Sequence, residues 1–374
     1  MFPLLVPAPP RAALTVSTLC ALAMPAGLAF LAASGRVMTR VADFIGISLA
    51  GAVAVGIASV ASRTVYGAGR QMAAARRVGS YELLEPLARG GMGEVWKARH
   101  LFLARPAAVK LILPEQLQGR AEDQERVIQR FTREAQVTAE LCSPHTVDLF
   151  DFGVSADGAL YYAMELLEGI NAEHFVYQFG PIEPRRAAHW LQQACHSLGE
   201  AHARNLIHRD IKPSNLYVCR YGRDRDFVKI LDFGLTKSLE PQTDPNLTHA
   251  GIRMGTPGYM APEQIFGKEP GPRTDLYALG CVAYWLVSGV RPFEGVSVGE
   301  LLSQHTLDPP PPPSRKAAHP LPDRLERLIL SCLAKEPRDR PASADQVSLE
   351  LEECFAQEAW SAEDARRWWD IKGQ

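Results

Sequence analysis

The chain has 374 residues, of which 47% are hydrophobic and 22% are charged, and its formal net charge is −2. These values fit a globular protein of two domains or one large bilobal domain, long enough to bury a core. The near-neutral charge gives no electrostatic reason to expect a nucleic-acid partner. The seven cysteines are scattered without a C-x-x-C pair, which indicates reduced thiols and no disulfide framework or zinc site.

The N-terminal end is far more apolar than the rest of the chain. Residues 12–34 and 44–62 carry no charge and are separated by a turn with Arg36 and Arg40. About 20 apolar residues cross the hydrocarbon core of a bilayer as a helix. The sequence therefore predicts two transmembrane helices at about 12–34 and 41–62, within a membrane region over residues 1–80.

The alternative for the first segment is a cleaved signal peptide over residues 1–34, since "FLAAS" offers small residues for cleavage. Either way, a basic juxtamembrane flank follows the second segment before any acidic residue: Arg63, Arg70, Arg76 and Arg77. Such a flank is typical of the cytoplasmic side. We expect a protein of the inner (cytoplasmic) membrane, bound to the lipid bilayer, with its soluble part in the cytoplasm.

The second apolar segment has small residues at i, i+4 spacing, namely Ser48, Ala52 and Gly56. This spacing permits close contact between two helices and would suit a homodimer. Alanine-rich segments also produce such spacings by chance, so both interpretations stay open.

The soluble part begins with "YELLEPLARGGMGEVWKARH", residues 81–100, which alternates like two strands around a glycine-rich turn. A G-x-G-x-x-G phosphate loop would need glycines at 88, 90 and 93, but position 88 is Ala88. Gly90, Gly91 and Gly93 remain. Alone, such a loop is a weak signal for nucleotide binding.

Further elements follow in an informative order. "RPAAVKLIL" is a short apolar strand that contains Lys110, and the helical stretch 122–141 places Glu134 near its inner face. Two strand-like segments, "TVDLFDFGV" and "LYYAMELLEG", come next, and the chain turns helical from about residue 184.

The chemistry-bearing stretches are "LIHRDIKPSNLYV", residues 206–218, and "VKILDFGLTK", residues 228–237. Asp210, Lys212 and Asn215 fall within one short loop, and Asp232 follows a strand. Phosphoryl transfer needs a carboxylate that orients the nucleophile, two metal ligands and cations on the phosphates. The pattern indicates that chemistry because both stretches occur in order behind a glycine loop, a strand lysine and a helix glutamate.

Over residues 81–350 these motifs make the chain similar to eukaryotic-type (Hanks-type) bacterial serine/threonine protein kinases. The resemblance implies an α+β bilobal protein kinase fold, with a β-rich N-lobe and an α-rich C-lobe, after the two transmembrane helices. Residues 351–374 are then a C-terminal helical tail. The resemblance also implies ATP and Mg²⁺ as cofactors and Ser/Thr hydroxyls of proteins as acceptors.

The resemblance assigns a role to each motif residue. The implied catalytic residues are Asp210, Lys212, Lys110, Glu134 and Thr256. Among them Asp210 is the base, and Lys110 contacts the α/β-phosphates beside its helix partner Glu134, while Asn215 and Asp232 are the Mg²⁺ ligands. The implied nucleotide-binding residues are Leu87, Ala88, Gly90, Gly91, Gly93, Val95, Ala108, Lys110, Met164, Glu165, Leu167, Asn215 and Asp232.

Other matches concern structure and regulation. The resemblance implies that Asp275 braces the catalytic loop and that Arg340 pairs with Glu263. The resemblance also implies that Lys212 meets the γ-phosphate and that Thr256 links it to the base, a composition typical of serine/threonine kinases. We expect autophosphorylation of the activation segment at Thr248, eight residues before Thr256.

Two alternatives to an active protein kinase remain to be tested. A pseudokinase scaffold is disfavoured because the whole catalytic set is present, and a small-molecule kinase is disfavoured by "GTPGYMAPE", residues 255–263. The tail "WSAEDARRWWDIKGQ" holds three of the six tryptophans. We expect it to pack on the larger lobe as an amphipathic helix, the alternative being a contact with a membrane surface or a partner.

Overall fold

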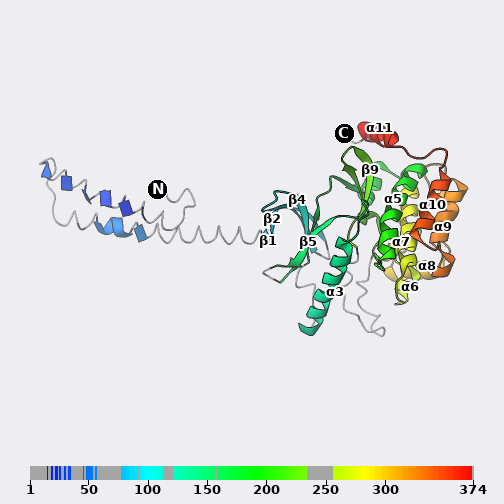
Figure 1. The fold of residues 1–374 in the computed structure, drawn as a ribbon, viewed down its shortest axis with the longest axis horizontal. Helices are drawn as coiled ribbons and strands as arrows, with labels where there is room; N and C mark the ends of the chain where they lie inside the picture. The colour runs from blue at the N-terminus through cyan, green and yellow to red at the C-terminus, as the bar shows by residue number, and fades with distance from the viewer. Residues whose placement is uncertain are drawn as a thin grey trace. The chain divides into compact units, whose positions relative to one another are not determined.

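The computed structural model describes residues 77–90, 93–112, 121–155, 158–233 and 256–372, together with scattered positions between 15 and 56. The chain divides into two units, residues 1–84 and 85–374. Figure 1 traces the whole chain from the N-terminus (blue) to the C-terminus (red).

In the first unit, the described positions between 15 and 56 are helical, apart from a turn at Ser34. Much of each predicted transmembrane helix, about 12–34 and 41–62, lies outside the described residues. Among the positions that are described, no helix is both long enough and apolar enough to cross a membrane. The unit includes the strand β1 (Arg77–Val78), which pairs antiparallel with the start of β2 (Tyr81–Gly90), and it ends at Leu84 within β2.

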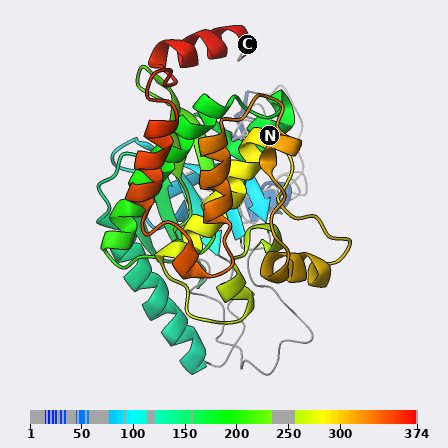
Figure 2. The ribbon, with the colours of Figure 1, turned by 90° about the vertical axis from the view of Figure 1, so that its right-hand side faces the viewer.

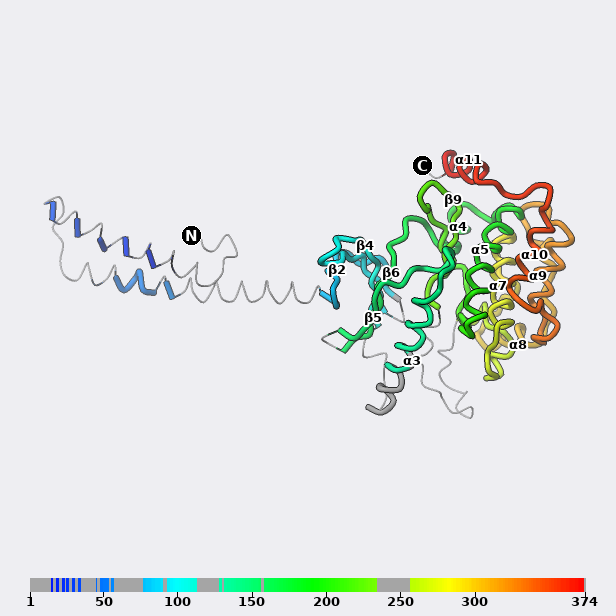
Figure 3. Tube along the Cα trace, in the orientation of Figure 1, coloured from blue at the N-terminus to red at the C-terminus, as the bar shows by residue number. Residues whose placement is uncertain are grey.

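The second unit starts with an antiparallel sheet. Its strand order is β2-β3-β4-β6-β5, and the further strands are β3 (Gly93–His100), β4 (Pro106–Ile112), β5 (Leu149–Val154) and β6 (Leu160–Glu165). The helix α3 (Ala121–Ala139) packs on β5. Figure 3 shows this sheet and α3 as one side of the second unit.

The N-lobe core is small and forms between α3 and the inner face of the sheet. Phe131 and Ala135 of α3 meet Ile112 of β4 and Tyr162 of β6, and all four side chains are buried. The spacing of Phe131 and Ala135 places both on one face of the helix, as the apolar pattern of the sequence predicts.

The C-lobe is mostly helical. Its small sheet has the order β7-β8-β9, with β7 (Gly169–Asn171), β8 (Leu216–Tyr221) and β9 (Asp224–Ile230). The longer helices are α4 (Ala172–Phe179), α5 (Pro184–Ala203), α7 (Pro272–Ser288), α8 (Val298–Leu307), α9 (Asp323–Cys332), α10 (Ala344–Cys354) and α11 (Ala362–Lys372). Short turns of helix are η3 (Pro213–Asn215), η6 (Pro257–Tyr259), α6 (Pro262–Ile265), η7 (Pro313–Arg315) and η8 (Pro337–Asp339).

The helix α7 is the centre of this lobe. Its residues from Thr274 to Ser288 are buried, and α5 and α9 pack against it. A helix that is apolar nearly all round is stable only inside a core. Figure 2 shows α10 and α9 (orange-red) beside the green α5 and yellow α7, with α11 separate from this bundle.

The architecture matches the α+β bilobal fold expected from the sequence: a β-rich N-lobe and an α-rich C-lobe. The tail was predicted to pack on the larger lobe, and α11 does so by lying against β9. Its contacts are described below.

Candidate active site

The catalytic loop is positioned by a buried carboxylate. Asp275, near the start of α7, accepts hydrogen bonds from the backbone N–H of His208 at 2.9 Å and of Arg209 at 2.8 Å. His202 Nε2 lies 2.8 Å from the same carboxylate. Arg209 has φ 65°, a left-handed conformation that is costly for a residue with a side chain. The two hydrogen bonds therefore hold the loop in a strained backbone state.

Burial by itself raises the pKa of Asp275, but the hydrogen bond and charge of His202, with smaller contributions from His208, outweigh it and hold this pKa below its usual value. The carboxylate thus stays ionised while buried. Its contribution to stability is present above the unfolded-state pKa of about 3.9 and is lost as the pH falls through the lower folded-state pKa.

His208 is a structural residue. Its ring is buried and lies against Phe233, with ring centroids 4.7 Å apart, and its Nε2 is 2.9 Å from the carbonyl oxygen of Leu231. Desolvation lowers its pKa. The ring therefore connects the catalytic loop to the segment that carries Asp232.

The loop brings four of the sequence-predicted catalytic and metal-binding residues together. Lys212 Nζ lies 2.7 Å from Asp210 Oδ2 and donates to Thr256 Oγ1 at 3.2 Å. Asn215 Nδ2 donates to the backbone oxygen of Asp210 at 2.8 Å and to its Oδ2 at 3.3 Å. The amide oxygen of Asn215 does not take part in these bonds, which orients the amide so that a cation can use that oxygen.

Two side chains of the N-lobe contact Asp232. Lys110 Nζ, on β4, lies 2.5 Å from Asp232 Oδ2, and the hydroxyl of Tyr162, on β6, donates to Oδ1. Burial by itself raises the pKa of Asp232, but the Lys110 ammonium and the Tyr162 hydroxyl lower it below its usual value. Burial and the Asp232 charge raise the pKa of Tyr162 well above its usual value.

Lys110 and Glu134 have different partners here. The recorded ion pair of Lys110 is with Asp232, whereas Glu134 Oε1 lies 4.0 Å from Arg209 Nη1. The structure therefore does not bring the predicted Lys110–Glu134 pair together. Formation of that pair remains a prediction for the nucleotide-bound protein.

The apolar residues among the predicted nucleotide-binding residues lie on the strands β2, β3, β4 and β6 and just after β6. Ala108 lies opposite Met164 in the β4–β6 ladder, and Val95 lies opposite Lys110 in the β3–β4 ladder. Met164 and Ala108 are buried together, with Val95 and Leu231 packed against the same cluster. Leu167 follows β6, where it is half-buried, and Leu87 in β2 is half exposed.

Glu165 ends β6 and begins the segment between β6 and β7 that joins the two lobes, here called the hinge. A lysine that the sequence analysis missed holds it in place. The buried Lys229 of β9 lies 2.5 Å from Glu165 Oε1 and donates to the carbonyl oxygen of Thr146 at 3.1 Å. The same Glu165 oxygen accepts the backbone N–H of Asp148 at 2.8 Å. The link ties the hinge to the strand that leads into Asp232.

The glycine loop keeps its essential feature. Gly93 has φ 136°, and a Cβ atom there would lie 1.9 Å from the carbonyl oxygen of Leu111. Ala88 lies in β2, exposed, with φ outside the left-handed region. The methyl group of Ala88 therefore fits without backbone strain. Gly91 lies outside the described residues, and Gly90 ends β2.

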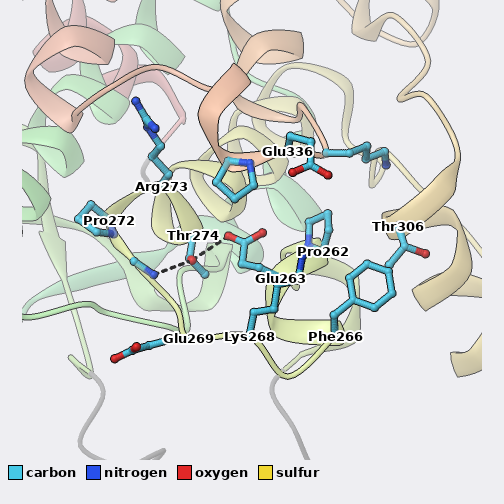
Figure 4. A pocket seen from close by; sticks show the side chains of 13 residues that line it. Pro262, Glu263, Phe266, Lys268, Glu269, Pro272, Arg273, Thr274, Thr306 and Glu336 are labelled. Carbon is cyan, nitrogen blue, oxygen red and sulfur yellow. Dashed lines mark hydrogen bonds between the residues drawn. The ribbon is translucent and has the colours of Figure 1, made fainter.

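The described surface also has a pocket of about 330 Å³, which is lined by residues between 262 and 337. It is formed by α6, the start of α7 and the segment around Glu336 (Figure 4). Thr274 donates to Glu263 at 2.8 Å, and Arg340 pairs with Glu263 at 2.7 Å. The resemblance implied the second of these two contacts. No predicted nucleotide-binding residue lines it, so we do not assign it to nucleotide.

The comparison with protein families identifies the family of this domain. The model of the protein kinase domain matches residues 81–351. The chain belongs to the protein kinase domain family. The resemblance to bacterial serine/threonine protein kinases is confirmed by relatives with that name.

Two such relatives illustrate the similarity. The chain is 38% identical over 274 residues to serine/threonine-protein kinase pkn3 of Myxococcus xanthus, covering 73% of this chain and 49% of the relative. It is 36% identical over 271 residues to serine/threonine-protein kinase PknD of Mycobacterium tuberculosis, covering 72% and 39%. The chain thus spans half or less of the length of these curated relatives.

Among solved structures, the crystal structure of the Mycobacterium tuberculosis PknI kinase domain is similar at a TM-score of 0.57 and 26% sequence identity. The alignment covers 74% of this chain and 97% of that domain. Rad53 in complex with AMP-PNP aligns at a TM-score of 0.58 and 24% identity, which supports the fold alone.

Two site features had no clear sequence signal. Tyr162 looks like an ordinary residue of a buried apolar strand, and only the structure places its hydroxyl on Asp232. Lys229 lies in "DFVKI", where strand alternation predicts one exposed face, yet it is 1% exposed. The contact between Lys229 and Glu165 could be predicted only from the way β9 packs in the folded protein.

Two substitutions in the glycine loop test this geometry. Gly93→Ala forces a Cβ into the Leu111 carbonyl, so we expect a loss of at least about 1–3 kcal/mol of unfolding free energy and weaker binding of an ATP analogue. Ala88→Gly relieves no strain and should lower the unfolding free energy by only about 0.4–1 kcal/mol, with analogue affinity nearly unchanged. Urea denaturation and analogue titration measure both; equal effects of the two changes would contradict the assignment.

Proposed function

We propose that this chain is a membrane-tethered serine/threonine protein kinase that transfers the γ-phosphate of ATP to Ser/Thr hydroxyls of proteins. The observation that carries the proposal is the contact set of Asp210, Lys212 and Asn215 on one braced loop, with Thr256 bound to Lys212 from the start of η6. This set offers a base, a cation and a metal ligand, the parts that phosphoryl transfer needs.

The loop residues divide the work of the reaction. The Asp210 carboxylate accepts the proton of the attacking hydroxyl, which points the oxygen at the γ-phosphorus. Lys212, already 2.7 Å from Asp210, balances the charge that grows on the phosphoryl group. Thr256 accepts a hydrogen bond from the Lys212 ammonium and so links it to the start of η6.

Nucleotide binding requires a change of partners. Lys110 has its ammonium on Asp232, so its contact with the α/β-phosphates competes with that ion pair. The oxygens of Asp232 and the amide oxygen of Asn215 are hard donors of the type that Mg²⁺ prefers, and these two residues would hold it. When bound, Mg²⁺ supplies positive charge that neutralises the phosphate oxygens.

The membrane tether rests on the first unit. The two charge-free segments of the sequence are long enough to span a bilayer. Their described residues expose large apolar side chains, among them Phe30, 74% exposed, and Leu49, 64% exposed. Such exposure in water is unfavourable and is relieved by lipid. The i, i+4 spacing of Ser48, Ala52 and Gly56 supports pairing of two copies within the membrane.

The catalytic assignment is tested by phosphate transfer. The full chain with labelled Mg-ATP should phosphorylate itself, at Thr248 among other sites, and a generic acceptor protein. Asp210→Ala should lower kcat by about 10²–10⁴ because the base is lost, while the exposed control Asp224→Ala should leave it unchanged.

Mass spectrometry then maps the phosphate. Transfer by Asp210→Ala equal to that of the unsubstituted chain would contradict the role of Asp210. Absence of transfer by every form, with an intact fold, would favour the pseudokinase scaffold.

The tether is tested by fractionation of cells. The full chain should sediment with the inner membrane and resist extraction by high salt, with residues 85–374 open to protease only from the cytoplasmic side. The double substitution Leu49→Arg with Val53→Arg should release part of the protein, since each arginine at a helix centre costs about 2.5–3.5 kcal/mol of insertion. Leu349→Arg, on the exposed side of α10, is the control. Recovery of the unsubstituted chain in the soluble fraction would contradict the tether.

A further inference from the structure

A buried carboxylate in the β8–β9 hairpin has four side-chain donors. Asp226 Oδ2 accepts from Arg186 Nε at 2.7 Å and from Trp360 Nε1 at 2.9 Å. Asp226 Oδ1 accepts from Arg186 Nη2 at 2.6 Å and from Trp369 Nε1 at 2.7 Å. Asp226 and Arg186 are 1% and 2% exposed. Both oxygens of the carboxylate are therefore fully used inside the protein.

Two of the four donors come from the C-terminal tail. Trp360 precedes α11 and Trp369 lies in it, whereas Arg186 belongs to α5. Asp226 has φ 54°, a left-handed conformation that Asp tolerates better than most residues. The left-handed backbone conformation of the hairpin therefore occurs at the same residue that the tail contacts. Gln193 of α5 also contacts Asp226, because its side-chain amide donates to the Asp226 carbonyl oxygen at 2.9 Å.

Aromatic rings surround the Arg186 guanidinium. Trp368 lies nearest, with 3.9 Å between the guanidinium carbon and the ring centroid. The remaining rings lie 4.7–5.9 Å away and belong to Phe175, Trp190, Trp360 and Trp369. Cation–π contacts of this kind are strongest where water is excluded. We call Asp226, Arg186, Trp360, Trp368 and Trp369 the tail anchor.

The tail anchor also touches the helix that follows the hinge. Trp368 packs on Phe175 and Phe179 of α4, with ring centroids 4.9 and 5.0 Å apart. The helix α4 in turn packs on η3, the turn that contains Asn215. The strand β7, between the hinge and α4, pairs with β8, which begins directly after Asn215. The other partner of β8 is β9, which ends two residues before Asp232.

The tail anchor therefore contacts α4. Through α4 and the β7–β9 sheet it is connected to the hinge and to both predicted metal ligands. The family model ends at residue 351, so Trp360 and α11 lie beyond it. We propose that Trp360, Trp368 and Trp369 are positioning residues for Mg-ATP, which act through α4 and the β7–β9 sheet. This inference rests on the proposed kinase function.

The test uses the full chain and graded substitutions. Trp369→Phe with Trp360→Phe keeps the rings but removes two donors from Asp226. Asp226→Asn is nearly isosteric but turns one acceptor oxygen into a donor that faces Arg186 and a tryptophan. The matched control is Arg367→Ala, an exposed residue of α11 whose ion pair with Glu363 at 3.4 Å is also exposed.

Steady-state kinetics should separate positioning from simple stability. We expect kcat/KM for Mg-ATP to fall roughly tenfold in the anchor variants, the size typical of a displaced binding group. Most of the change should appear in KM, because α4 and β7 adjoin the hinge. Hydrogen exchange should rise in residues 172–179 and 213–218, whereas α9 should keep its protection. Arg367→Ala should match the unsubstituted chain in both measurements.

Each contrary result is informative. A lower Tm with kcat, KM and local exchange unchanged in the folded protein would show that the tail only stabilises the fold, and would overturn the inference. So would anchor variants that match the unsubstituted chain in every measurement. If Asp226→Asn does not fold, the tryptophan pair decides. A chain that transfers no phosphate at all refutes the proposed function instead, and hydrogen exchange then still tests the coupling of the tail to α4.

Discussion

The buried carboxylate of Asp275 fixes the backbone on which the proposed chemistry depends. It binds two consecutive N–H groups of the catalytic loop and so holds Arg209 in a left-handed conformation. The next residue is Asp210, whose direction follows from that backbone. Because α7 is buried along its length, Asp275 cannot move without disturbing the C-lobe core. The rigid core thus sets the position of Asp210, the proposed base.

The N-lobe side of the site is arranged differently. Asp232 is held by Lys110 and Tyr162 from two strands, and Glu134 lies near Arg209. Three charged groups that the proposed reaction would use are therefore paired with one another or with the loop. Nucleotide phosphates and a divalent cation would replace these pairings with stronger ones. In the proposed reaction, the nucleotide and its cation would complete the charge arrangement of the site.

Sequence patterns predicted much of this organisation. The apolar spacing of 122–141 indicated α3 with its inward face, and the loop around Asp210 was found because short-range spacing fixes which side chains share a turn. Partners far apart in the chain were harder to predict. Asp226 stands in "GRDRDF", which resembles an exposed charged hairpin, yet it is buried under two tryptophans from the tail. Only the tertiary packing shows that the Asp226 carboxylate is paired and shielded from water.

The substitution Asp275→Asn tests the central claim most directly. The amide keeps the size of the side chain but presents a donor to one of the two backbone N–H groups. We expect a folded protein with reduced stability, whose kcat falls by roughly tenfold to a hundredfold because Asp210 is misplaced. Asp323→Asn, at the exposed start of α9, should leave kcat unchanged. An Asp275→Asn protein with unaltered kcat would show that this carboxylate does not set the position of Asp210.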